Sequence, residues 1–202
     1  RSHWQAAHLS GDSTLRLELD RLDKRFDGNQ ALRGLSLSVP EFRSLSIIGP
    51  SGGGKTTLLR ILAGLTVPDD GCVRIDGQTL EFSEVALLAH RRSIGTVFQA
   101  YNLFPHLSAR DNVLLPLTKV HGVPLPEAEA IADELLARFQ LTPHANRRPA
   151  ELSGGQQQRV AIVRAIAIRP RFLVFLFVLA LLVVRFFFFF QAEDGIRDRN
   201  VT

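Results

Sequence analysis

The sequence of 202 residues has no methionine, a single cysteine, one tryptophan and one tyrosine. Because a disulfide needs two thiols, the lone Cys72 excludes an internal disulfide and is typical of a protein from a reducing compartment. The missing initiator methionine predicts that the chain is a fragment or a processed product. Its first residues, RSHWQAAHLSGDST, lack the charged-then-apolar pattern of a signal peptide, and we expect residues 1–14 to be disordered.

A strong excess of charge of one sign is also missing. The formal net charge is +4, with Lys and Arg spread along the chain, so the pattern favours solvated surfaces over a nucleic-acid-binding face. Hydrophobic residues make up 46% and charged residues 22%, which is the ordinary composition of a globular domain. We therefore expect one domain, or a domain with a subdomain, and no nucleic-acid partner.

The first half of the chain predicts strands around one helix. Apolar and polar residues alternate in TLRLELDRL and again in ALRGLSLSV, which predicts two half-buried strands. SLSIIG (44–49) is a short apolar run that ends in glycine and predicts a central, buried strand. KTTLLRILAGL predicts a helix that ends near Gly64, and CVRIDGQTL predicts a strand with a turn at Asp76 and Gly77.

The second half predicts two long helices. LPEAEAIADELLARFQL is rich in helix-forming residues and has one apolar stripe, made by Ile131, Leu135, Leu136 and Phe139. GGQQQRVAIVRAIAI predicts the second helix. Ser153, with Gln156 three residues later, matches the capping-box pattern and fixes where that helix begins.

The stretch GPSGGGKT, from Gly49 to Thr56, fits the phosphate-loop pattern G-x-x-x-x-G-K-[ST]. Its glycines allow consecutive main-chain N–H groups to point at a polyphosphate, and the following helix presents its positive end to the same oxygens. A lysine there reaches the terminal phosphates and a threonine hydroxyl ligates Mg²⁺. The alternative is a glycine-rich turn that only caps a helix. The residues expected to bind nucleotide are Gly49, Ser51, Gly52, Gly53, Gly54, Lys55, Thr56 and Thr57.

Three further stretches carry a family resemblance. LSGGQQQRVAIVRAIAIRP (152–170) resembles the signature motif of ATP-binding-cassette (ABC) ATPases, about a hundred residues after the phosphate loop. VFQAYNLFPHLSARDNV (97–113) resembles the Q-loop of that family, with Gln99 in the key position. Phe26 resembles the aromatic residue against which the adenine stacks. Together the motifs cover residues 15–175, which we expect to be a partial ABC ATPase domain.

The resemblance implies a fold, an activity and partners. The fold is an α/β P-loop NTPase, with a RecA-like core, an antiparallel β subdomain and a helical subdomain at about 101–155, truncated at the Walker B strand. The cofactors are ATP and Mg²⁺, with Thr56 and Gln99 on the metal. Ser153, Gly154, Gly155 and Gln156 would contact the ATP of a second subunit, which implies a dimer. Phe26 as a core side chain, Gln99 as a solvated amide and Ser153 as a simple helix cap remain alternatives.

The sequence pattern FQxxNLFPHLS and the triple glutamine 156–158 most resemble those of importers of polar amino acids. Polyamine importers share much of this pattern. Such a cassette is a peripheral protein on the cytoplasmic face of the bacterial inner membrane. It docks on transmembrane permease subunits and serves a substrate-binding protein indirectly. A soluble ABC ATPase of repair or translation, or a non-catalytic nucleotide-binding module, are the competing functions.

The strand after the signature should end in the Mg²⁺-organising Asp and the catalytic Glu, but these positions hold Leu176 and Phe177. Neither side chain accepts a proton or ligates a metal, and no histidine follows His144. The family resemblance therefore leaves no catalytic residue intact, and we expect weak ATP binding and little or no hydrolysis.

Between Phe172 and Phe190 the only polar residue is Arg185, which leaves three interpretations of the tail. One is a membrane helix, because such a run nearly crosses a hydrocarbon core of about 30 Å. Another is a degenerate pseudoenzyme. The third is that residues 176–202 are non-native: sequencing error from about Leu176, and then QAEDGIRDRNVT, which resembles a translated sequencing adapter.

Overall fold

The computed structural model describes residues 14–176 and 181–184. The strands are β1 (Leu15–Phe26), β2 (Asn29–Phe42), β3 (Ser44–Ile47), β4 (Asp70–Ile75), β5 (Gln78–Thr79), β6 (Gly95–Phe98), β7 (Leu173–Leu176) and β8 (Leu181–Val184). The helices are α1 (Lys55–Leu62), α2 (Glu84–Ser93), α3 (Ala109–Leu115), α4 (Leu125–Arg138) and α5 (Gly154–Ala167). Shorter helical turns are η1 (Pro116–Val120), η2 (Thr142–His144) and η3 (Pro149–Glu151). Apart from Thr14, the predicted disordered stretch lies outside the described residues, as does most of the predicted non-native tail.

The first sheet is antiparallel, in the order β2-β1-β4-β5. Its interior strand β1 confirms the predicted alternation, because Leu15, Leu17 and Leu19 are buried while the residues between them are more exposed. The hairpin between β4 and β5 turns at Asp76 and Gly77, with φ of 52° and 77°. Two successive positive φ values match the twist of the flanking strands, which confirms the predicted turn.

The second sheet has the order β3-β8-β7-β6 among the described residues. β6 and β7 are parallel, and β8 is antiparallel to both β7 and β3. β3, β6 and β7 therefore all run in the same direction. Their carboxyl ends lie at one edge of the sheet, where α/β proteins bind their ligands.

The prediction of a central, buried strand at 44–49 is wrong. β3 is an edge strand of the sheet that the described residues form, and it ends at Ile47. Ser44 and Ser46 are exposed, while Leu45 and Ile47 are half-buried against the apolar core. The serine at every second position accounts for the partial burial, because it gives this short strand one apolar face instead of two.

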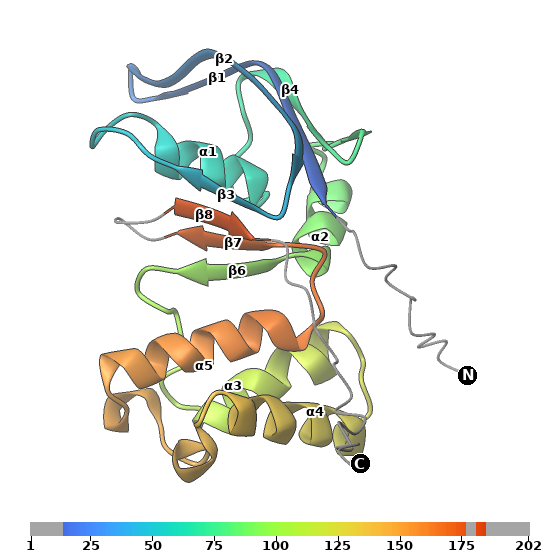
Figure 1. Ribbon diagram of the computed structural model, residues 1–202, viewed down its shortest axis with the longest axis vertical. Coiled ribbons are helices and arrows are strands. Elements are labelled where there is room, and N and C mark those ends of the chain that lie inside the picture. Colours follow the sequence, from blue (N-terminus) through green and yellow to red (C-terminus); the bar gives the residue numbers. More distant parts are fainter. Residues whose placement is uncertain (1–13, 177–180, 185–202) are drawn as a thin grey trace, which may run out of the picture.

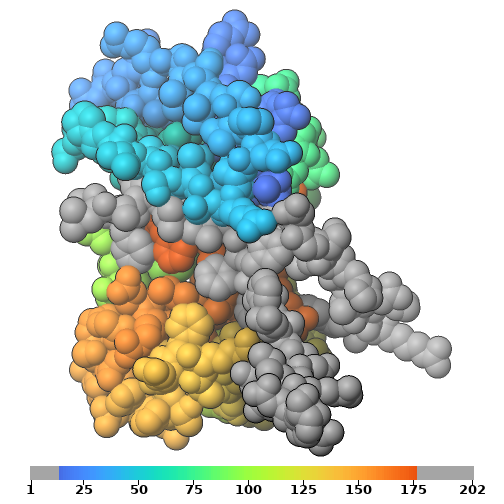
Figure 2. All heavy atoms as spheres, viewed as in Figure 1, coloured from blue at the N-terminus to red at the C-terminus, as the bar shows by residue number. Residues whose placement is uncertain are grey.

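The molecule is layered (Figure 1). The antiparallel sheet and α1 lie at one end, the second sheet lies in the middle, and α3, α4 and α5 lie beyond it. A space-filling view shows the same separation, with the N-terminal strands and the helices of residues 125–167 at opposite ends (Figure 2). Two apolar cores join the layers: one surrounds α1, and the other joins α3, α4 and α5 to β6.

The predicted helices are confirmed as α1, α4 and α5, and the apolar stripe of α4 faces the second core. The sequence did not predict α2 or α3, although Ser83 caps α2 by accepting from the amide of Ala86 and Ser108 caps α3 by accepting from the amide of Asp111. Within residues 14–176 and 181–184, none of the helices has the length and apolar character needed to cross a bilayer.

Candidate functional site

The phosphate loop connects the carboxyl end of β3 to α1. Gly52 and Gly54 have φ of 79° and 75°, a region that glycine enters without steric cost. The first helical bond of α1 runs from the amide of Leu58 to the carbonyl of Gly54 (2.9 Å), and no side chain caps the helix. The N–H groups of residues 55–57 are therefore available at the positive end of the helix, an arrangement that binds anions.

Lys55 adds a charge to this loop. Its Nζ donates to the carbonyl oxygens of Gly49 (2.8 Å) and Pro50 (2.5 Å), so the ammonium lies against the loop. The first turn of α1 contains no acidic residue that would neutralise it. Main-chain donors, a helix end and one ammonium together fit a polyphosphate, and the Thr56 hydroxyl at the helix start fits a cation bound to it.

The strand β2 packs directly on this loop. A Cβ at Gly54 would collide with the main-chain oxygen of Ala31, so only glycine fits there. Phe26 pairs with Asn29 at the hairpin end of the same two strands. The hairpin that carries Phe26 therefore lies beside the phosphate loop.

Phe26 is 45% exposed, so its ring is available to an adenine rather than buried in a core. The Nζ of Lys24 lies 5.3 Å from the ring centroid and is bonded to Asp69 (2.7 Å). The Lys24 ammonium, together with the Arg25 amide, holds the pKa of Asp69 below its usual range. This ion pair fixes Lys24 against one side of the aromatic ring.

Gln99 and Leu176 lie at the same sheet edge. Gln99 follows β6 directly and is exposed, and Leu176 is the register partner of Phe98, the residue just before it. The expected Walker B position is therefore next to Gln99. The Leu176 side chain that occupies it is 8% exposed and belongs to an apolar core. Phe177 lies outside the described residues.

Thr56 and Gln99 could supply oxygen ligands to Mg²⁺. No group of three His, Cys, Asp or Glu that could hold a metal occurs in the described part of the chain.

The signature residues form the start of α5. The Ser153 Oγ accepts from the amide of Gln156 (3.3 Å), and the Gln156 Oε1 accepts from the amide of Ser153 (2.8 Å), which confirms the predicted capping box. A Cβ added at Gly154 or Gly155 would meet open space. Figure 1 shows α5 on the far side of the middle sheet from α1. One chain therefore does not bring its signature and its phosphate loop together.

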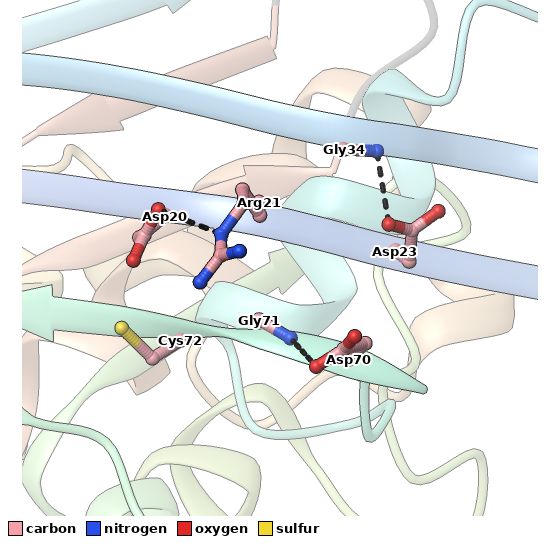
Figure 3. A pocket seen from close by; sticks show the side chains of 7 residues that line it. All are labelled: Asp20, Arg21, Asp23, Gly34, Asp70, Gly71 and Cys72. Atoms are coloured by element: carbon pink, nitrogen blue, oxygen red, sulfur yellow. Dashed lines mark hydrogen bonds and ion pairs between the residues drawn. The ribbon is translucent and has the colours of Figure 1, made fainter.

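A separate cavity of about 410 Å³ lies between β1, β2 and β4 (Figure 3). It contains none of the predicted site residues, and its carboxylates already have partners. Asp23 accepts from the amide of Gly34 (3.1 Å), and Asp70 accepts from that of Gly71 (2.7 Å). Asp20 pairs with Arg21 (3.5 Å). We assign no function to this cavity.

Comparison with known proteins decides the family. The family model described as "ABC transporter" matches residues 32–175, which is most of the chain. The chain belongs to this family. The match begins in β2 and ends in β7, so it includes the phosphate loop, Gln99 and the signature residues.

Two curated ABC proteins show how much of a cassette is present. The glutamate transport ATP-binding protein GluA of Corynebacterium efficiens is 42% identical over 159 residues, which is 79% of this chain and 66% of GluA. The spermidine/putrescine import ATP-binding protein PotA of Chromobacterium violaceum is 46% identical over 157 residues, 78% of this chain and 42% of PotA. The chain thus spans less than two thirds of either relative.

A solved ABC structure shares the fold. It is the dimeric ATP-binding cassette MJ0796 in a post-hydrolysis state bound to ADP and Pi, with a TM-score of 0.71 and 38% sequence identity. The similarity covers 79% of this chain and 72% of that one. An ABC ATPase fold, with an antiparallel sheet, an α/β core and a helical layer, is therefore confirmed.

Proposed function

We propose that this ABC chain is the nucleotide-binding part of an ATPase subunit that powers solute import. The observation that carries the proposal is the phosphate loop, where the uncapped end of α1 and the Lys55 ammonium meet at the carboxyl edge of the sheet. Gly49, Ser51, Gly52, Gly53, Gly54, Lys55, Thr56 and Thr57 would hold the phosphates of ATP. Phe26 would stack on the adenine, and Thr56 and Gln99 would ligate Mg²⁺.

The proposed active form is a dimer. Since α5 and the phosphate loop lie in different layers of one chain, Ser153, Gly154, Gly155 and Gln156 would contact a nucleotide held by a second copy, and the two glycines leave open space for it. The MJ0796 cassette, which has the same fold, is a dimer. We propose further that the dimer docks on permease subunits at the cytoplasmic face of a bacterial inner membrane, and that a substrate-binding protein supplies the solute.

We propose polar amino acids as the solute class. The support is the resemblance of residues 97–113 to such importers, together with the similarity to a glutamate transport protein. The similarity to a polyamine import protein makes polyamines the second candidate. Co-purification of this chain with an amino-acid permease, but not with a polyamine permease, is the expected result. The reverse pattern would transfer the assignment to polyamines.

The chain as written is proposed not to turn over ATP. Bound ATP would supply the reactive phosphoanhydride, and hydrolysis needs a carboxylate to orient water and another to organise Mg²⁺. The Leu176 side chain can do neither. Phosphate release should be absent from this chain and should appear in the L176D/F177E variant. Equal release by both chains would overturn this part of the proposal.

Nucleotide binding is tested by stability. A ligand at a hundred times its Kd stabilises a folded protein by about 2.7 kcal/mol, so saturating Mg-ATP should raise the urea midpoint of the 202-residue chain. Lys55→Ala should abolish the increase, whereas Lys119→Ala, at an exposed lysine in η1, should retain it. An unchanged midpoint in the parent chain, or the same increase in Lys55→Ala, would contradict the proposal.

A further inference from the structure

The loop that follows Gln99 has an unusual backbone. Tyr101 and Asn102 both have positive φ, 60° and 47°, a region that non-glycine residues seldom occupy. Local turn bonds join the amide of Tyr101 to the carbonyl of Phe98 (2.9 Å) and the amide of Asn102 to that of Ala100 (2.6 Å). Such a conformation persists only where surrounding contacts hold it.

Arg164 provides two of these contacts. From the last turn of α5, its Nη1 donates to the carbonyl of Asn102 (2.8 Å) and its Nη2 donates to the carbonyl of Tyr101 (2.9 Å). The guanidinium carbon lies 5.9 Å from the centroid of the Phe104 ring. One planar group thus holds two consecutive carbonyls and contacts the next aromatic side chain, a geometry that the fork of arginine allows and lysine does not.

The environment of Arg164 makes these contacts costly to lose. The side chain is half-buried, and burial lowers the pKa of Arg164 below its ordinary value. A charge that water solvates poorly needs polar partners, and the two carbonyls supply them. Both the loop and the arginine are therefore stabilised by the same pair of hydrogen bonds.

Asn112 ties the second half of this loop to α3. Its side chain is fully buried; Oδ1 accepts from the amide of Phe104 (2.8 Å), and Nδ2 donates to the carbonyl of Ser108 (2.9 Å). The same Nδ2 also contacts the carbonyls of Phe104 and Leu107. The loop is thus held by the helical layer at both ends, and only Gln99 and Ala100 separate it from β6.

We propose that Arg164 is a positioning residue for Gln99. By holding the carbonyls of Tyr101 and Asn102, it fixes the backbone that presents the Gln99 side chain to a Mg²⁺-nucleotide. Because Arg164 belongs to the helix that begins with the signature residues, it also links that helix to the phosphate site of its own chain. The inference rests on the proposed ATP-binding function and assigns a role in it to Arg164, which lies within the signature stretch 152–170 but is not among the predicted site residues.

The first test needs no nucleotide. In the 202-residue chain, Arg164→Lys should speed amide hydrogen exchange at Tyr101 and Asn102 at least tenfold, while Val160 in α5 keeps its protection. Arg159→Lys, at an exposed arginine of the same helix, is the matched control and should exchange like the parent chain. Unchanged exchange in a folded Arg164→Lys chain overturns the proposal. Should that variant not fold, Arg164→Gln, which keeps one amide donor, decides the same comparison.

The second test separates positioning from simple stabilisation. The affinity of each chain for a fluorescent ATP analogue is measured once in Mg²⁺ and once in EDTA. The ratio of the affinity in Mg²⁺ to the affinity in EDTA is then compared between variants. Arg164→Lys should reduce this ratio at least threefold without changing the affinity in EDTA, and Gln99→Ala should have the same effect. The double variant should lose no more than either single variant, because both act through the same side chain.

A structural role alone would lower the melting temperature and leave the Mg²⁺ ratio of Arg164→Lys at the parent value, which overturns the proposal. Additive losses in the double variant, or a parent chain without any Mg²⁺ enhancement, also overturn it. If the parent chain binds no analogue under either condition, the proposed ATP-binding function fails. The exchange experiment still decides in that case whether Arg164 holds the loop.

Discussion

At the scale of single residues, Gly54 is the position where the phosphate loop tolerates least change. It has a φ of 75° and faces the main-chain oxygen of Ala31. Gly54→Ala should therefore destabilise the chain twice: about 1–2 kcal/mol for the left-handed backbone and about 1–3 kcal/mol for the collision. Urea unfolding measures the sum, and loss of ATP-dependent stabilisation should accompany it because the loop must move.

Gly77 is the control for this change. It has nearly the same φ, 77°, but a Cβ there meets open space. Gly77→Ala should show only the backbone cost and leave ATP binding intact. Equal destabilisation by the two substitutions would mean that β2 moves away from the added methyl group at little cost in free energy.

His90 makes stability depend on pH. It joins α2 to α1 through a bond between Nε2 and the Leu62 carbonyl (2.8 Å). Burial, followed by the charges of Arg171 and Arg91, lowers the pKa of His90 below its ordinary 6.5, although the bond to Leu62 opposes the shift. The unfolded chain then binds the proton first as pH falls, so the free energy of unfolding should decrease from about pH 7.5 to pH 5.5.

His90→Gln should flatten this pH dependence in urea titrations, whereas His106→Gln, at an exposed loop position, should leave it as it is. A smaller slope should remain in His90→Gln, because burial and then Arg92 also lower the pKa of His121. If His90→Gln and the parent chain lose stability equally on acidification, His90 is not the group responsible.

At the scale of elements, two serine caps have the same geometry and different proposed roles. Ser153 accepts from Gln156 at the start of α5, and Ser83 accepts from Ala86 at the start of α2, each at 3.3 Å. Replacing either serine by alanine should cost about 0.5–2 kcal/mol of stability. Only Ser153→Ala should also weaken ATP-dependent dimerisation, measured by light scattering. A similar effect of Ser83→Ala would show that dimerisation depends on helix stability and not on contact with the nucleotide.

The elements that the sequence predicted well are those fixed by local contacts. The capping box of Ser153 and Gln156 and the turn at Asp76 and Gly77 involve neighbours in the chain, so pattern and structure agree. Arg164 could not be recognised, because its partners Tyr101 and Asn102 are more than sixty residues away and offer only main-chain carbonyls. Every residue has a main-chain carbonyl, so the sequence does not show which carbonyls accept a hydrogen bond from an arginine.

At the scale of the molecule, the candidate site depends on strand direction. The phosphate loop, Gln99 and Leu176 lie at one edge of the second sheet because β3, β6 and β7 run in the same direction, which the family resemblance implied and no local pattern specified. The edge position of β3 was also not predictable, because no local pattern specifies which strands pair with each other. Its neighbour β8 follows β7 after residues 177–180, and a connection that short joins antiparallel strands, whereas parallel neighbours need a dozen residues or more.

The layered arrangement predicts complementation between two defective chains. In a dimer in which α5 of one copy contacts the nucleotide of the other, Lys55→Ala damages both phosphate loops and Ser153→Ala damages both signatures. A mixed dimer of the two variants has one site with both parts intact. Tagged Lys55→Ala should therefore retain untagged Ser153→Ala at ATP concentrations at least tenfold lower than either variant needs to pair with itself. If the mixture requires as much ATP as the self-pairs do, each site is built within one chain and the composite dimer is wrong.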